Sequence, residues 1–88
     1  MLRIAETNRQ DRIAGIVGGL LAQRHKANKP GPEDDLRQAG LSSLDMVKLV
    51  LSLEQEFDAA IPEKAITPAN FRSINAIAGL IGTVQSAP

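Results

Sequence analysis

The chain lacks several residue types that carry chemistry in other proteins. It has no cysteine, no tryptophan and no tyrosine, and only two phenylalanines among 88 residues. Without cysteine it can form no disulfide, no zinc–thiolate site and no thiol nucleophile. The single histidine, His25, excludes a multi-histidine metal site, so we expect no metal ion. No apolar run approaches the roughly 18 residues that span a bilayer, so we expect no membrane insertion.

The charge balance excludes another class of partner. Lys and Arg together number 10, as do Asp and Glu, which gives a formal net charge of zero. A basic surface for nucleic acid and the aromatic residues that stack on bases are both missing, so we expect no nucleic-acid partner. Polar residues already occur within residues 1–6, which contain no apolar signal segment. This predicts a cytoplasmic protein. The length predicts one domain, residues 1–88.

Apolar residues at helical spacing predict an all-α fold. Three main helices are expected at about residues 9–26, 43–57 and 73–82, and a short one at 68–71, where Thr67 and Pro68 mark a helix start. Gly82 is expected to end the last helix. Three glycines weaken the first helix and are expected to permit close approach of a neighbouring element: Gly15, Gly18 and Gly19. The predicted core comprises Ile13, Val17, Leu20, Met46, Leu49, Leu53, Phe57, Ile74, Ile77 and Ile81.

A long connection follows the first helix. Residues 27–35 contain Pro30, Gly31 and Pro32, which predict a loop. A long loop without anchors is uncommon in a compact domain, so apolar residues farther along should fix it to the core. These anchors are Leu36, Ala39 and Leu41.

The helix at 43–57 has a marked start. Ser42 followed by Asp45 matches a capping box, in which the serine hydroxyl bonds to the helix backbone. In that register, Ser43 occupies the first helical position with its hydroxyl free. The positive end of a helix favours an anion, such as a phosphodiester attached to Ser43. The simpler interpretation is that this serine pair only caps the helix.

The same helix carries a second apolar stripe. Leu44, Val47 and Leu51 lie on a different face from the predicted core residues of this helix. A chain this short can hardly bury both faces, so we interpret this stripe as a docking surface. The alternative is that the first helix or the long connection covers it.

The remaining polar candidates have structural interpretations. His25 lies near the predicted end of the first helix, where a solvated side chain interacting with the helix dipole is expected. The acidic residues at the end of the second helix form a solvated face: Glu54, Glu56 and Asp58. Two further acidic residues are interpreted as turn residues: Asp34 and Asp35. No nucleophile–base pair is visible, so we expect no enzymatic activity and no catalytic residue.

The ordered pattern of these features resembles the acyl carrier protein family. Residues 35–50, DLRQAGLSSLDMVKLV, resemble the family signature D-L-x-x-x-G-x-D-S-L-x-x-V-x-L-V. The similarity continues with LEQEF at 53–57 and with Ile61-Pro62, and it covers roughly residues 35–81. The resemblance implies a four-helix bundle of three main helices and one short helix. It also implies a 4'-phosphopantetheine arm, taken from coenzyme A and joined covalently to Ser43.

Details of the sequence are closer to one branch of that family. Ser42 replaces the usual Asp, Lys48 stands where fatty-acid carriers usually have Glu, and the chain is neutral where those carriers are acidic. The connection from Ile61 to Phe71 is also slightly longer than in the fatty-acid type of carrier. These features look more like aminoacyl carrier proteins and the D-alanyl carrier.

The resemblance implies a set of partners and a docking face. A phosphopantetheinyl transferase would attach the arm, and an amino-acid or acyl ligase or transferase would load it with a thioester-linked cargo. Because the cargo would be attached through Ser43, we expect these enzymes to bind the start of the second helix. We also expect the chain to act as a monomer. The expected docking residues are Leu44, Asp45, Val47, Lys48 and Leu51. The alternative function is a non-covalent helical interaction module in which Ser43 only caps a helix.

Overall fold

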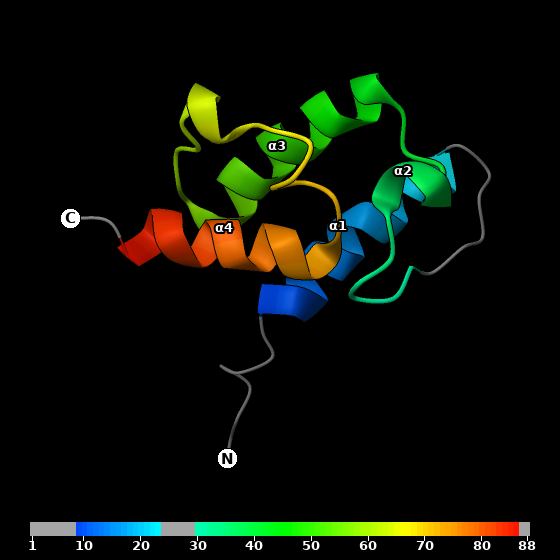
Figure 1. The fold of residues 1–88 in the computed structure, drawn as a ribbon, viewed down its shortest axis with the longest axis horizontal. Coiled ribbons are helices and arrows are strands. Elements are labelled where there is room, and N and C mark those ends of the chain that lie inside the picture. Colours follow the sequence, from blue (N-terminus) through cyan, green and yellow to red (C-terminus); the bar gives the residue numbers. More distant parts are fainter. Residues whose placement is uncertain (1–8, 24–29, 87–88) are drawn as a thin grey trace, which may run out of the picture.

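The described part of the chain consists of helices joined by loops and turns. The structure, a computed structural model, describes residues 9–23 and 30–86, and within these ranges it contains no strand. The elements in chain order are α1 (Arg9–Gln23), α2 (Leu36–Ala39), α3 (Ser43–Phe57), the 3₁₀ helix η2 (Glu63–Ala65) and α4 (Ile74–Ser86). Helix α1 packs against both α3 and α4, and α2 lies at the end of the bundle where α3 begins (Figure 1). The predicted all-α fold is confirmed.

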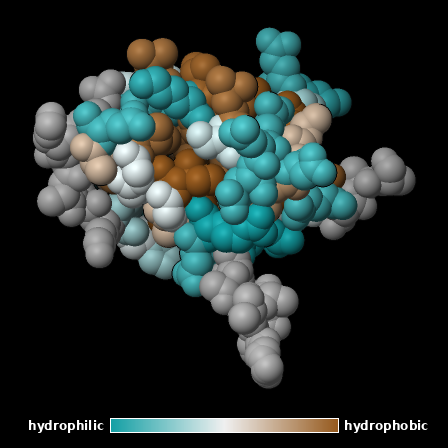
Figure 2. All heavy atoms as spheres, turned by 180° about the vertical axis from the view of Figure 1, so that it is seen from behind, coloured by the Kyte–Doolittle hydropathy of each residue, from teal (hydrophilic) through white to brown (hydrophobic). Residues whose placement is uncertain are grey.

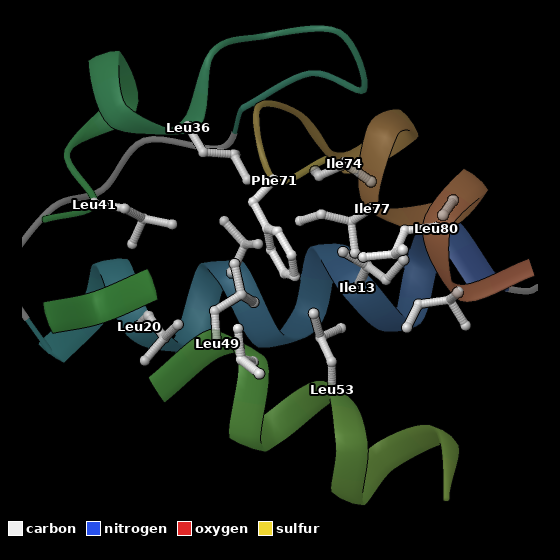
Figure 3. Close-up of a cluster of buried hydrophobic side chains, with 14 of the residues drawn as sticks. Ile13, Leu20, Leu36, Leu41, Leu49, Leu53, Phe71, Ile74, Ile77 and Leu80 are labelled. Carbon is white, nitrogen blue, oxygen red and sulfur yellow. The ribbon is translucent and has the colours of Figure 1, made fainter. Parts of the chain in front are cut away.

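The core lies where α1, α3 and α4 face one another (Figure 3). Nine of the ten predicted core residues are buried, because the helical stripes that predicted them face the neighbouring helices. Met46 is the exception: it is only half-buried, because it lies at the edge of the core beside an open groove. Val50, one turn later, is buried in its place.

The long connection contains a helix that the sequence analysis did not predict. Asp35 caps α2 by accepting hydrogen bonds from the backbone N–H of Arg37 at 2.9 Å and of Gln38 at 3.1 Å. Gly40, with φ of 125°, ends it in a conformation that favours glycine. Asp35 is therefore a helix cap, and only Asp34, which accepts a hydrogen bond from Gly31, belongs to a turn. The apolar anchors are confirmed in Leu36 and Leu41, which are buried, whereas Ala39 is half-exposed.

The short helix was predicted at the wrong place. The 3₁₀ helix lies at 63–65, whereas residues 68–71 form turns. Thr67 does cap this segment, accepting a hydrogen bond from Asn70 N–H at 3.2 Å. The segment does not continue as a helix because the Asn70 side chain donates to the Ala65 carbonyl at 2.8 Å, which ties it back to η2.

Helix α4 continues past its predicted end. Ser73 caps it as expected, accepting a hydrogen bond from Ala76 N–H at 3.1 Å. Gly82 does not end it, because Val84 still packs against the core, and such packing outweighs the helix-weakening effect of a glycine. The missing Cβ also leaves room for the Arg9 guanidinium, which would approach a Cβ to 3.2 Å. In α1, residues 24–26 of the predicted range, including His25, lie outside the described residues.

Truncating the core should cost far more than truncating the surface of the same helix. Leu53 is fully buried, so Leu53→Ala should lower the free energy of unfolding by about 2–5 kcal/mol. Leu51→Ala, two residues earlier but largely exposed, should change it by less than about 0.5 kcal/mol. Urea unfolding followed by circular dichroism measures both. Equal effects would show that the buried face has been assigned wrongly.

The glycines of α1 do not serve close packing. Among the described residues, a Cβ added at Gly15, Gly18 or Gly19 would meet no atom within 4 Å, which contradicts the expected close approach. Gly15→Ala should therefore raise the free energy of unfolding by about 0.5–1 kcal/mol through its higher helix propensity. Gly40→Ala is the matched contrast, because a φ of 125° strains any side chain, and this variant should be less stable than the parent. Thermal melts of the two variants provide the comparison.

Candidate functional site

The start of α3 is fixed by reciprocal hydrogen bonds between Ser42 and Asp45. The Asp45 backbone N–H donates to Ser42 Oγ at 3.2 Å, while Ser42 N–H donates to Asp45 Oδ2 at 2.9 Å, so both halves of the capping box form. The Ser42 hydroxyl also donates to Asp45 Oδ2 at 3.1 Å. The predicted register is therefore confirmed, and Ser43 is the first residue of α3.

Ser43 differs from Ser42 in what its side chain does. It is exposed, and within residues 9–23 and 30–86 no hydrogen bond engages its hydroxyl. The N-terminus of this 15-residue helix places positive partial charge and unpaired N–H groups beside that hydroxyl. An anionic group joined to the Ser43 oxygen would be stabilised there.

An open groove of about 880 Å³ begins at Ser43. One wall comes from α2 and the first two turns of α3, and the other from residues 66–72. Its lining includes apolar side chains from all three segments: Leu41, Met46, Val50, Ile66 and Phe71. Besides Ser43, five residues add polar groups to its lining: Asp35, Arg37, Gln38, Thr67 and Arg72. The groove was not predicted from the sequence, since its lining residues come from three separated segments of the chain.

The apolar stripe of α3, formed by Leu44, Val47 and Leu51, faces away from the core. These side chains are 60%, 56% and 61% exposed, respectively, so neither α1 nor the described part of the long connection covers them. In the space-filling view, hydrophobic side chains project along the edge of the molecule that α3 occupies (Figure 2). Large hydrophobic side chains that are more than half exposed and grouped on one helix are typical of an interaction surface.

One predicted docking residue must be withdrawn. Asp45 is only 2% exposed, because its carboxylate turns back to accept hydrogen bonds from Ser42. A carboxylate held in this way cannot also reach a partner, so Asp45 positions the helix start. Lys48, in contrast, is exposed, as the docking hypothesis requires.

The acidic end of α3 is structural, not merely solvated. Glu54 accepts a hydrogen bond from Ile61 N–H at 2.8 Å, which holds the chain after the helix. Glu56 forms an ion pair with Arg12 at 2.8 Å, and the Arg12 guanidinium lies 4.3 Å from the centre of the Phe57 ring. Asp58 ends the helix in a left-handed conformation with φ of 50°. These contacts anchor the C-terminal end of α3, which is the end opposite to Ser43.

Neither a cluster of metal-ligating side chains nor a membrane-spanning helix occurs in the described part of the chain. Among the residues that the structure describes, no three His, Cys, Asp or Glu side chains gather as metal ligands. No helix in the same part of the chain is long and apolar enough for a membrane span. The Ser43 region instead suits a covalently attached arm, with a free hydroxyl, a positive helix end and an adjoining groove.

Comparison with known sequences shows the family to which the chain belongs. The phosphopantetheine attachment site family matches residues 11–81 of the chain. Aminoacyl carrier protein 1 of Bradyrhizobium diazoefficiens is 40% identical over 77 residues, which cover 88% of this chain and 86% of the relative. Aminoacyl carrier protein 2 of the same organism is 42% identical over 74 residues, covering 84% and 83%.

Solved structures give the same relationship. A carrier protein in complex with the Bradyrhizobium japonicum glycine:[carrier protein] ligase and an analogue of glycyl adenylate has a TM-score of 0.79 and 39% identity, with 85% of this chain and 96% of that chain covered. The glycylated carrier protein bound to the same ligase has a TM-score of 0.77 and also 39% identity, covering 82% of this chain and 96% of that one.

Proposed function

This chain belongs to the phosphopantetheine attachment site family, and from that premise we propose that it is an aminoacyl carrier protein with Ser43 as its attachment residue. The observation that carries the assignment to Ser43 is the capping box. It commits the Ser42 hydroxyl to the backbone and leaves the neighbouring hydroxyl exposed at the helix start.

The chain's own residues have defined tasks in this function. The Ser43 oxygen forms a bond to the phosphorus of the pantetheine phosphate in coenzyme A, 3',5'-adenosine diphosphate leaves, and the transferase removes the hydroxyl proton. Ser42 and Asp45 hold the helix start in place, and its N–H groups stabilise the resulting phosphodiester. When bound, the arm would supply the thiol that this cysteine-free chain lacks, on which an amino acid could be held as a thioester.

The docking surface in this proposal is the apolar stripe of α3 together with Lys48. Any enzyme that acts on a group hanging from Ser43 must approach this end of the helix, and the stripe begins at the next residue. A small apolar contact gives modest affinity, which suits a carrier that must leave each enzyme. The chain itself performs no catalysis; it acts as a monomer in the cytoplasm, where coenzyme A and ATP are available.

The partners are a phosphopantetheinyl transferase and an amino acid:carrier protein ligase. The test is to attach the arm and then add the Bradyrhizobium japonicum ligase with ATP and each of a panel of small amino acids, starting with glycine. We expect one amino acid per chain, in a linkage that neutral hydroxylamine cleaves as it cleaves thioesters. A chain that gains the arm but accepts no amino acid would instead favour a different acyl cargo. A chain that gains no arm would leave the non-covalent interaction module as the remaining function.

A further inference from the structure

Three exposed positive charges lie around the start of α3, where the partly exposed Asp35 is the one carboxylate in the lining of the groove, although the chain as a whole is neutral. Lys48 follows Leu44 by one helical turn and borders the apolar stripe. Arg37 and Arg72 lie in the walls of the groove that begins at Ser43. Both arginines are exposed, and the side chain of Arg72 is 71% accessible. We call Arg37, Lys48 and Arg72 the cationic rim.

Two carboxylates beside this rim have hydrogen-bond partners within the chain, namely Asp45 and Asp35. Asp45 is buried against Ser42 in the capping box. Asp35 uses Oδ1 to cap α2, and its other oxygen lies 4.0 Å from Arg72 Nε, at the outer limit of an ion pair. A partly exposed pair at that distance contributes little, so Arg72 stays available to a partner.

Helix stability does not explain the position of Lys48. A helix favours cations near its C-terminus, yet α3 has no basic residue in its last turn and places this lysine in its second turn. Within residues 9–23 and 30–86, no ion pair engages Lys48 or the Arg37 guanidinium. The fold gives these two charges no internal task, so they can face a partner.

Given the proposed aminoacyl-carrier function, we propose that the ligase meets this face with an acidic rim. An apolar recess in the ligase takes the apolar stripe, and carboxylates around that recess face Arg37, Lys48 and Arg72. Complementary charge at the edge of a small apolar contact accelerates association and fixes orientation more than it raises affinity. The ligase would thus distinguish this neutral carrier from strongly acidic ones, whose own carboxylates would be repelled.

Association kinetics test this inference. The chain is first converted to its arm-bearing form and mixed in a stopped-flow instrument with the Bradyrhizobium japonicum ligase, over a series of NaCl concentrations. We expect the association rate constant of the parent chain to fall by about tenfold from low to high salt, as for steered encounters. Lys48→Glu should lower it by about tenfold at low salt, and Arg37→Glu combined with Lys48→Glu should reverse the salt dependence.

The matched control is Arg9→Glu. It makes the same change of two charge units as Lys48→Glu, but at the start of α1, where an acidic residue suits the helix dipole. It should associate at the parent rate, and thermal melts should show that all variants are folded. Charge-reversed variants that associate as fast as Arg9→Glu, or faster than the parent, would overturn the acidic-rim inference alone. A parent chain that gains no arm, or takes no amino acid from the ligase, would overturn the proposed function and this inference with it.

Discussion

Ser43→Ala is expected to abolish attachment of phosphopantetheine completely while leaving the helical bundle folded. The hydroxyl oxygen is the atom that would bond to phosphorus, so its removal leaves nothing to modify. Ser43 is exposed and its hydroxyl engages no hydrogen bond within the described ranges, so the substitution removes little that stabilises the fold. Intact mass spectrometry after incubation with coenzyme A and a phosphopantetheinyl transferase measures the first effect, and a thermal melt measures the second.

Ser42→Ala is the matched control for this loss, because it removes the neighbouring hydroxyl. It should still be loaded, but it should lower the free energy of unfolding by about 0.5–2 kcal/mol through the lost cap. The Ser43 variant therefore tests attachment of the arm, and the Ser42 variant tests the contribution of the cap to stability. If Ser42→Ala were the variant that stays unloaded while Ser43→Ala gains the arm, the attachment site would be off by one residue.

The second large effect is expected from Val47→Asp. A carboxylate in the middle of the apolar stripe would have to be desolvated on docking without a partner of its own, which is costly. It would also face the proposed acidic rim of the ligase. The arm-bearing variant should lose at least about tenfold in kcat/KM for amino-acid transfer, equivalent to about 1.4 kcal/mol. Its melting temperature should stay close to that of the parent, because Val47 is exposed.

Two further variants control for the added charge and for its burial. Ala14→Asp adds the same charge to an exposed position of α1 and should be loaded at the parent rate. Val50→Asp places the charge at a buried position of α3 and should lower the melting temperature sharply. Normal transfer by Val47→Asp with an unchanged melt would mean that the stripe is not the docking face. A collapsed melt would place Val47 in the core.

Features carried by one continuous segment could be predicted from the sequence. The bounds of α3 follow from its apolar stripe and from the capping pattern of Ser42 and Asp45, which depend only on residues within the helix. The exposed stripe of Leu44, Val47 and Leu51 follows from the same periodicity. The sequence also shows the helix that was missed: Asp35 before α2 and Gly40 after it are ordinary cap residues, and a helix of four residues simply has too few apolar positions to show a period.

Features that depend on distant contacts could not be predicted in this way. The pairing of Arg12 with Glu56 joins residues 44 positions apart, and neither residue type signals the other. The segment after α3 forms turns at 68–71 because Asn70 reaches back to Ala65, a choice that no local propensity decides. Asp45 was predicted correctly as a capping residue and wrongly as a docking residue. The sequence does not show that the capping hydrogen bonds bury this carboxylate and keep it from a partner.

The central claim is that a phosphopantetheine arm is attached to Ser43, and site-resolved mass spectrometry tests it most directly. The parent chain is incubated with coenzyme A and a phosphopantetheinyl transferase, digested, and fragmented so that Ser42 and Ser43 are distinguished. We predict a gain of one phosphopantetheine per chain, located entirely on Ser43. An unmodified chain, or an arm located on any other residue, would contradict the account.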